Sequence, residues 1–474
     1  MNIDQYNAQV ATLDINDIAD DENNRDILNR MKNDNTLCEY EYDLWIQETL
    51  EDEDSDYRPE GVEDMGWLGY FIGRHMHLNG LYIKDFDPMW GDVASDALIP
   101  FLEGVSRNTS IKKFWLLDTD LLNGRVFTAL GSFFTSNQRL DTIKLYNCDF
   151  GADGCRLFSL ALGNSTNKTL QHMALESNGI AEEGLVEIIT ALSMYPQLKA
   201  LSLSGNHLST NGCIALATLL QHSTTKLQSL RLVNNEINDE GIEALVPVLA
   251  HHNHLQLIKL CNNRSVTSKG WQHITTILES PNSKLKTLHI TFNNIDDEVV
   301  SAYARALVNN EVLTTLYMHH SILPSITDKG MNSLSNTICD TSSINATYLS
   351  NHTLKMTTTK SNSLDRLLEL NCFGSNKKEV AMIKILQYHN DFYMQPFFEW
   401  EFKVLPLMIN WFERASSITM PINFEPNIER RKLSSIYQFI RGMPLLYVET
   451  HLKKELEDKK DYNSRKRRGG WPHF

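Results

Sequence analysis

The stretch LQSLRLVNNEINDEGIEALVPVL at residues 227–249 is one copy of a pattern that runs through most of the chain. Its first half has the form Leu-x-x-Leu-x-Leu-x-x-Asn-x-Ile, and its second half the form Gly-Φ-x-x-Φ-x-x-x-Φ, where Φ is apolar. Segments that start at Ile111 and Leu313 match the first half of the pattern with substitutions, and segments that start at Leu78 and Ile344 match it loosely. Clear further copies of the first half start at Leu140, Leu170, Leu198, Leu255 and Leu285. The starts from 111 to 313 are 28 to 30 residues apart, so the chain contains a tandem array.

The two halves of the pattern predict different secondary structure. The Leu-x-Leu alternation is typical of a short strand, whereas apolar residues at i, i+3 and i+7 form one face of a helix. The helical half recurs at Gly154, Gly184, Gly212, Gly241, Gly270 and Gly330. One strand and one helix cannot bury their apolar faces alone, but stacked units form a continuous core. We therefore predict an α/β fold, a leucine-rich-repeat solenoid or horseshoe with a parallel inner sheet, outer helices and a helical C-terminal cap.

An asparagine follows most of the predicted strands, at the point where the chain leaves the sheet. Its amide both donates and accepts hydrogen bonds, so we expect it to satisfy backbone groups that would otherwise be buried without partners. Cys148 occupies this position in one unit and is a weaker donor.

These repeats resemble the ribonuclease-inhibitor-type leucine-rich-repeat proteins over roughly residues 78–360. The flanks resemble a narrower group, the expanded leucine-rich-repeat family of diatoms. The segments that carry this second resemblance are GVEDMGWLGYFIGRHMHLNGLYI before the repeats and LLELN, KEVAMIKILQYH, VLPLMINWFERASS and LSSIYQFIRGMPLLYVE after them. The resemblance implies the fold and an interaction role, but it does not bring an established biochemical activity with it.

The formal net charge of −15 is unevenly distributed. Residues 1–64 contain 20 acidic and 4 basic side chains, and we expect a largely disordered acidic arm with a helix around Tyr42–Leu50. Residues 65–77 are predicted to form an N-terminal cap and residues 78–360 a solenoid of about ten units. Residues 361–452 are predicted to form the helical C-terminal cap and 453–474 a basic tail.

Composition excludes several classes of protein. The hydrophobic content of 42% and charged content of 22% are those of a globular chain. The first twenty residues lack the features of a secretory signal, no apolar stretch is long enough for a membrane span, and the seven scattered cysteines favour reduced thiols. We expect a cytoplasmic protein, with nuclear import through RKRR at 465–468 as the alternative.

Motifs for catalysis are missing, so we predict a non-enzyme without a cofactor. The sequence contains no phosphate-binding loop, no H-E-x-x-H and no G-x-S-x-G. His251-His252-x-His254 and the group His289, His319 and His320 are the nearest candidates for a metal site, and we interpret both as ordinary polar residues. Cys155 and Cys213 occupy helix core positions and are interpreted as small apolar residues rather than nucleophiles.

The residues between the strand leucines should face away from the core, on the concave side of the solenoid. Aromatic and charged side chains gather there, and such residues often anchor protein interfaces. The predicted partner-binding residues are Trp115, Lys144, Tyr146, Glu176, Arg231, Lys259, His289, Tyr317, His319 and Tyr348.

The function predicted from these features is a scaffold or recognition module that binds a protein partner on the concave face. Regulation of a small GTPase, in the manner of a GTPase-activating protein, is one alternative and rests on fold analogy alone. A substrate receptor of a ubiquitin ligase is another. We expect no membrane association and no nucleic-acid binding, because the repeats lack a basic stripe with interleaved aromatic residues.

Overall fold

The structure is a computed structural model of the 474-residue chain. It describes residues 1, 3–33, 42–47, 56–84, 92–119, 124–221, 226–318, 326–357, 362–373 and 376–389. The chain divides into two compact units, which consist of Met1–Met331 with Met356–Lys360, and of Asn332–Lys355 with Ser361–Phe474.

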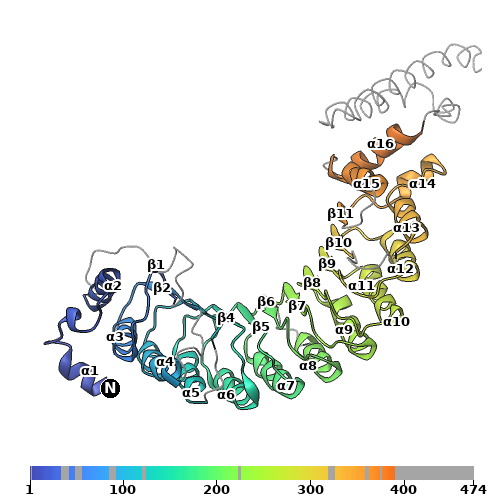
Figure 1. Cartoon of the computed structure of the whole chain (residues 1–474). Helices are drawn as coiled ribbons and strands as arrows, with labels where there is room; N and C mark the ends of the chain where they lie inside the picture. Colours follow the sequence, from blue (N-terminus) through green and yellow to red (C-terminus); the bar gives the residue numbers. More distant parts are fainter. Residues whose placement is uncertain are drawn as a thin grey trace, which may run out of the picture. The chain divides into compact units, whose positions relative to one another are not determined.

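The first unit is built on one parallel sheet whose strands follow each other in sequence order, from β1 to β11. Each strand pairs with the strand of the next repeat (Figure 1). The strands are β1 (Tyr42–Gln47), β2 (Leu78–Lys84), β3 (Lys113–Leu117), β4 (Thr142–Tyr146), β5 (His172–Glu176), β6 (Ala200–Ser202), β7 (Ser229–Arg231), β8 (Leu257–Lys259), β9 (Thr287–His289), β10 (Thr315–Tyr317) and β11 (Met356–Thr357).

The connections between strands are helical, and Figure 1 shows α4 to α12 along one side of the sheet. This arrangement confirms the predicted α/β leucine-rich-repeat solenoid. The helices of the first unit are α1 (Ile3–Gln9), η1 (Ile15–Asp17), α2 (Glu22–Lys32), α3 (Val62–Ile72), α4 (Asp92–Val105), α5 (Gly124–Ser136), α6 (Gly151–Asn164), α7 (Glu182–Ala191), η3 (Leu192–Met194), α8 (Thr210–Gln221), α9 (Asp239–His251), α10 (Ser268–Gln272), α11 (Thr275–Glu279) and α12 (Asp297–Leu307), with α13 (Asp328–Ile338) crossing into the second unit.

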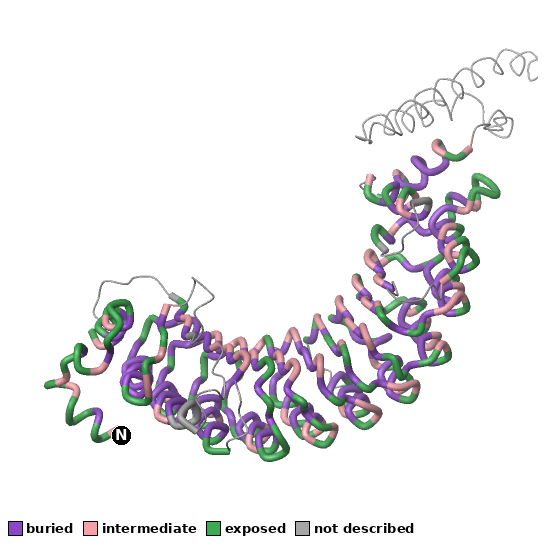
Figure 2. Tube along the Cα trace, in the orientation of Figure 1, coloured by how far each residue is buried: buried purple, intermediate pink, exposed green. Residues whose placement is uncertain are grey.

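The core lies between the sheet and the helices, as the buried segments in Figure 2 show. Within the quoted repeat, Leu230 and Leu232 on the strand and Leu245 on the helix are at most 1% exposed. The equivalent residues of neighbouring repeats stack on them, so burial continues from unit to unit. The residues between the leucines are left on the opposite face of the sheet.

The asparagine after most strands joins consecutive repeats, which confirms its expected role. Asn206 is 4% exposed, and its amide nitrogen donates to the carbonyl oxygens of Leu175 and Leu203 at 2.7 and 3.1 Å. Its amide oxygen accepts from the backbone N–H groups of Asn178 and Ile180 at 3.2 and 3.1 Å. In the Cys148 position, the thiol donates to the Leu116 carbonyl at 3.3 Å. Asn178, Asn235, Asn263 and Asn293 form comparable bonds to the preceding repeat.

A second position with buried asparagine precedes the strands, three residues before the first leucine, and was not recognised in the sequence. Asn137 donates to the Ile111 carbonyl at 3.1 Å and accepts from its own Leu140 N–H at 2.9 Å. Asn167 repeats the arrangement one unit later. At Asn137 and Asn167 this position fastens the start of a strand segment to the preceding repeat, as the other asparagine position does at the end of most strands.

Carboxylates at the start of one helix cap the start of the next. Glu182 accepts from the Asn211 and Gly212 N–H groups at 2.9 and 3.2 Å, and Asp239 accepts from the Thr267 N–H at 2.7 Å. The glycine of the helical pattern makes room for this contact, because a Cβ at Gly270 would lie 2.2 Å from an Asp239 carboxylate oxygen. The recurring glycine is thus explained by close approach between repeats.

The N-terminal segment differs from the expected disordered arm. In this structure α1, η1 and α2 are formed, Tyr6 is 5% exposed, and its ring lies 4.7 Å from that of Trp67 on α3. Leu28 is fully buried. The prediction weighed the net charge of the whole segment and gave too little weight to the apolar residues of α2, which have helical spacing. Residues 34–41 and 48–55 lie outside the described residues.

Two local predictions of secondary structure are wrong. The helix expected around Tyr42–Leu50 is strand β1, because Leu44 and Ile46 alternate as core residues and pair in register with β2. The solenoid therefore starts one unit before residue 78, and α3, which overlaps the end of the expected arm and the expected N-terminal cap, is the helix of that first unit. At the other end, the segment that starts at Ile344 is not a strand but helix α14.

The second unit is helical in its described part, with α14 (Ile344–Leu349), α15 (Asn362–Phe373) and α16 (Lys377–Tyr388). Lys384 of α16 is fully buried, and its amine donates to the carbonyls of Ile338 and Asn351 at 2.5 and 2.8 Å. Burial lowers the pKa of Lys384 to about 7. Helices α15 and α16 lie in the segment predicted to be the C-terminal cap. The rest of that segment, from 390, and the basic tail with RKRR lie outside the described residues.

We predict that Asn206→Ala destabilises the solenoid by about 3 kcal/mol, since it leaves buried carbonyl and N–H groups of two repeats without partners. Urea unfolding followed by circular dichroism measures the loss. The control is Asn253→Ala, at an exposed turn, which should cost less than about 0.5 kcal/mol. Equal urea midpoints for the two variants would contradict the stabilising role of the buried asparagine amide.

We predict that acid weakens the contacts between repeats. Burial raises the pKa of Asp297, but the hydrogen bonds from Thr327 and Gly330 together outweigh it and hold the pKa below its usual value. A lowered pKa stabilises the fold above the unfolded-state pKa of about 4, and this contribution disappears as pH falls through the folded-state value. Asp297→Asn should therefore lower Tm at pH 7, and the difference from wild type should shrink towards pH 3.

The matched control for this acid dependence is Glu243→Gln at an exposed position of α9. Its Tm should follow that of the wild type at every pH. A Tm difference for Asp297→Asn that does not change with pH would show that the carboxylate charge is not responsible.

Candidate functional site

The open face of the sheet carries one side chain from each of the strands β1 to β10 in a continuous row. The strand register aligns Trp45 on β1 with Tyr82 on β2 and Trp115 on β3, and continues to Tyr317 on β10. We call this line the central row. Its members are Trp45, Tyr82, Trp115, Lys144, Ala174, Ser202, Arg231, Lys259, His289 and Tyr317.

Most of the predicted partner-binding residues lie on this face. Trp115, Lys144, Arg231, Lys259, His289 and Tyr317 belong to the central row, while Tyr146 and Glu176 are adjacent to it at the ends of β4 and β5. Tyr348 is misplaced in the prediction, because it lies on α14 and not on a strand. The strand after β10 is instead β11, and Asn351, three residues before Leu354, has the position of the buried asparagines before other strands. His319 lies outside the described residues.

An aromatic cluster occupies the β1 end of the central row. The rings of Trp45 and Tyr82 are stacked with centroids 4.4 Å apart, and Trp115 meets Tyr82 edge-on at 4.7 Å. The Lys144 ammonium lies 4.9 Å from the centre of the Trp115 ring and 5.9 Å from that of Tyr146. Such pairs contribute about 1 kcal/mol each, so the cluster is held in place without a partner.

Asp43 fixes the buried member of this aromatic cluster. Tyr82 is 4% exposed, and its hydroxyl donates to the Asp43 carboxylate at 3.1 Å. Burial and the nearby charge of Asp43 raise the pKa of Tyr82, so the phenol stays protonated. Trp45 and Asp43 were missed in the sequence because β1 was not recognised. The Leu44-x-Ile46 alternation, with Trp45 in the position of Tyr82, was the available signal.

Three nitrogen-bearing side chains follow each other further along the central row. Arg231, Lys259 and His289 are register partners on β7, β8 and β9. The His289 ring lies 4.2 Å from that of Tyr317. Burial, together with the positive charges of Lys259 and Arg231, lowers the pKa of His289 to about 4, so the imidazole is neutral near pH 7. We call Arg231, Lys259 and His289 the basic step.

The candidate metal site around His252 has a structural explanation. His252 is 7% exposed and occupies the position of the buried asparagines before the strands. Its Nδ1 accepts from the N–H groups of His254 and Leu255 at 3.4 and 3.2 Å. In the described part of the chain, His, Cys, Asp and Glu side chains form no group of three suited to a metal ion. The group of His289, His319 and His320 is not described in full.

The buried thiols have the chemistry of apolar residues. Burial, together with the nearby charge of Glu187, raises the pKa of Cys155 to about 12. Burial and the charge of Glu182 raise that of Cys213 to about 12 as well. A nucleophilic cysteine needs a lowered pKa, so neither thiol is suited to attack a substrate.

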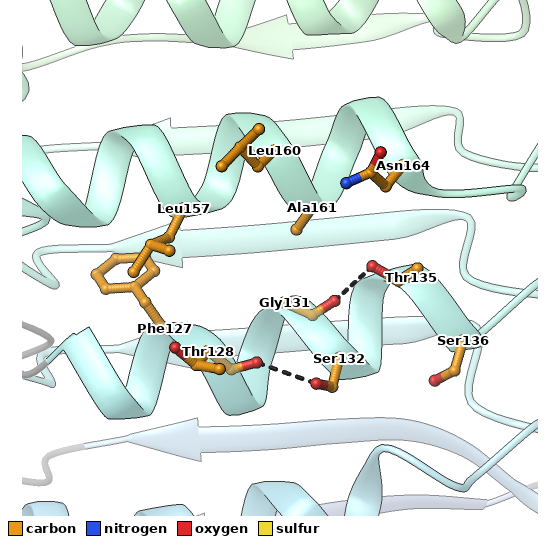
Figure 3. Close-up of a pocket in the computed structure, with 10 residues that line it drawn as sticks. All are labelled: Phe127, Thr128, Gly131, Ser132, Thr135, Ser136, Leu157, Leu160, Ala161 and Asn164. Atoms are coloured by element: carbon orange, nitrogen blue, oxygen red, sulfur yellow. Dashed lines mark hydrogen bonds between the residues drawn. The ribbon is translucent and has the colours of Figure 1, made fainter.

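The helical side of the solenoid has a shallow hollow of about 380 Å³ between α5 and α6 (Figure 3). Leu157 and Leu160 line it from α6, and four hydroxyl side chains line it from α5. Those hydroxyls are occupied, because Thr128, Ser132 and Thr135 each donate to the carbonyl four residues before, and Ser136 donates to the Ser106 carbonyl. Asn164 on α6 is the remaining polar side chain of the lining, and one amide gives a ligand little orientation, so the open face of the sheet is the stronger candidate.

Comparison with known proteins agrees with the repeat fold. Residues 196–217, 224–246 and 282–302 match a family model described as "Leucine Rich repeat". The fold is a leucine-rich-repeat solenoid. The chain is 31% identical over 171 residues to NACHT, LRR and PYD domains-containing protein 13 of Homo sapiens, which covers 35% of this chain and 16% of that protein. It is 28% identical over 219 residues to ribonuclease inhibitor of Sus scrofa, which covers 45% of this chain and 46% of that protein.

Both curated relatives are thus matched over less than half of their own length. Among solved structures, the solenoid is similar to leiomodin-1 actin-binding site 2, with 20% identity, a TM-score of 0.25, and coverage of 37% of this chain and 85% of that one. The tropomodulin C-terminal domain of Caenorhabditis elegans gives 15% identity, a TM-score of 0.26, and coverage of 34% and 93%. No helix among the described residues has the length and apolar character needed to cross a membrane.

We predict that His289 titrates near pH 4 and that Arg231→Gln/Lys259→Gln raises its pKa towards 6.5, because two positive charges that disfavour the imidazolium are removed. Burial remains, so the rise should stop short of the usual value. NMR of selectively labelled histidines measures the titration, with His289→Gln used to assign the signal. An unchanged His289 pKa in the double variant would contradict the electrostatic coupling.

Proposed function

We propose that this chain is a non-enzymatic protein-interaction module that holds a partner protein on the open face of its sheet. The observation that carries the proposal is the aromatic cluster of Trp45, Tyr82, Trp115, Lys144 and Tyr146. Tryptophan and tyrosine are the residues most often found at the energetic centres of protein interfaces. Here Trp45, Trp115 and Tyr146 are at least partly exposed, on a face that the described helices leave uncovered.

The cluster is suited to binding because it is ordered in advance. The stacked Trp45–Tyr82 pair and the Lys144–Trp115 contact fix side-chain rotamers in the unbound chain. The side chains of the cluster therefore lose less conformational entropy when a partner binds, which improves affinity without additional contacts. Ten strands about 4.8 Å apart give a central row roughly 43 Å long, enough for an interface of ordinary size.

The comparisons support the class of function and leave the partner open. Ribonuclease inhibitor is by its name a protein that acts on another protein, and the proposal carries that kind of role to this chain. Membership of the expanded diatom family stays a prediction, as does a cytoplasmic or nuclear location. No feature of the described residues favours a GTPase regulator or a ubiquitin-ligase receptor, and we do not propose them.

We predict that Trp115→Ala weakens binding of a purified partner by about 2 kcal/mol, roughly thirtyfold in Kd, because it removes the centre of the aromatic cluster. Partners are first captured with the tagged full-length chain and identified by mass spectrometry. Affinity is then measured by calorimetry. Lys144→Glu serves as a second variant, since its half-buried side chain is not part of the core.

The control is Leu160→Ala, which removes an exposed apolar side chain from the helical side of the solenoid. It should leave the affinity unchanged. If Trp115→Ala and Lys144→Glu both fold as the wild type and bind every partner as tightly as Leu160→Ala does, the partner does not bind at this end of the face.

A further inference from the structure

Arg231 and Lys259, two adjacent cations of the basic step, have no ion-pair partner in the part of the chain that the structure describes. Arg231 is exposed and Lys259 is half-buried, and their strands are register partners about 4.8 Å apart. The charges are therefore available to an external group.

The inner-face neighbours of this pair are all uncharged or basic. Ser202 precedes Arg231 in the central row, and His289 follows Lys259. Along and beside the two strands, the neighbouring positions are occupied by Ala200, Ser204, Ser229, Val233, Leu257, Cys261, Thr287 and Thr291. Glu176 is on β5, two strands before β7, and Glu236 is bonded to His207 at 2.7 Å. No carboxylate of these strands balances the step.

The positive charges of Arg231 and Lys259 affect the pKa of the neighbouring His289. Burial contributes most to the low pKa of His289, and the charges of Lys259 and Arg231 lower it further. A third positive charge in the row is thus disfavoured while the surface is free. An anion bound beside Arg231 and Lys259 would reverse this effect and make protonation of His289 easier.

We propose that Arg231 and Lys259 select a partner whose docking segment presents carboxylate side chains, aspartate or glutamate, to the middle of the central row. This inference rests on the proposed function and adds the chemistry of the partner to it. The step spans three strands, about 10 Å, which suits two or three carboxylates. Neutral Ser202 and Tyr317 flank it, so the positive charge is local and does not form the continuous track that a nucleic-acid strand requires.

The experiment uses the full-length chain and a fluorescein-labelled peptide in which glutamate and serine alternate. Fluorescence anisotropy compares Arg231→Ala/Lys259→Ala with Lys269→Ala/Arg305→Ala, which removes the same charges from α10 and α12 on the helical side. Arg231→Ala/Lys259→Ala should bind the glutamate peptide about tenfold more weakly than Lys269→Ala/Arg305→Ala does. This difference in affinity should decrease as the salt concentration rises to about 0.3 M. Binding of the glutamate peptide should also raise the pKa of His289 in the wild type.

A charge reversal tests the same contact in the opposite direction. Arg231→Glu/Lys259→Glu should lose the glutamate peptide and gain a matched lysine peptide, which a general loss of folding cannot produce. Equal binding of the glutamate peptide by the two alanine variants would overturn the proposal. Tighter binding of a labelled single-stranded DNA or of a phosphoserine peptide at the same residues would overturn it in favour of a phosphate-bearing partner.

These outcomes are separate from the test of the proposed function. If Trp115→Ala weakens a purified partner but Arg231→Ala/Lys259→Ala does not, the open face binds protein and the carboxylate inference fails. If neither variant affects the partner, while both fold as the wild type, the proposed function fails as well.

Discussion

Burial of an asparagine amide between consecutive repeats is the interaction on which the solenoid depends. Leucines supply most of the apolar contact, but leucine packing alone does not fix how one strand is placed against the next. The amide of Asn206 contacts backbone groups of both its own repeat and the preceding one, and is almost fully buried. Because its donors and acceptors all need partners, a shifted register would leave several of them unsatisfied.

The register set by these amides also arranges the open face. Since most strands are placed by the same bonds and pair in register, the residue between the two strand leucines recurs at one position, and ten such residues form the central row. The residues that determine the fold and the residues that form the open face are therefore different positions of each repeat. Leu230 and Leu232 determine the fold, whereas the residue between them, Arg231, is free to differ from unit to unit and to determine what the face recognises.

The sequence was sufficient to predict the fold, because leucine spacing and the glycine-led helical pattern repeat too often for a chance match. It also placed most of the central row correctly. Prediction failed where a unit departs from the pattern. Trp45 was missed because β1 has only two core positions to identify it, and Tyr348 was misplaced because Ile344 starts a helix with Ser343 as its N-cap.

Other features were not accessible to pattern matching at all. The role of His252 depends on which backbone N–H groups its ring accepts from, and the neutral state of His289 depends on burial and on charges from two other strands. Both follow from distances between repeats, which residue spacing alone does not give. The net charge of residues 1–64 was also a poor guide to their structure, because a net charge does not reflect the helical spacing of Leu28 and its apolar neighbours.

The sequential order of the strands has a consequence for how the chain acquires its structure. Every strand pairs with the strand of the next repeat, so the pairing partners are separated by about one repeat of sequence and never by the length of the chain. Loop closure between near neighbours costs little entropy and is fast. During synthesis on the ribosome, each repeat can dock on the one before it as soon as it emerges, and the growing end is the only strand edge that waits for a partner.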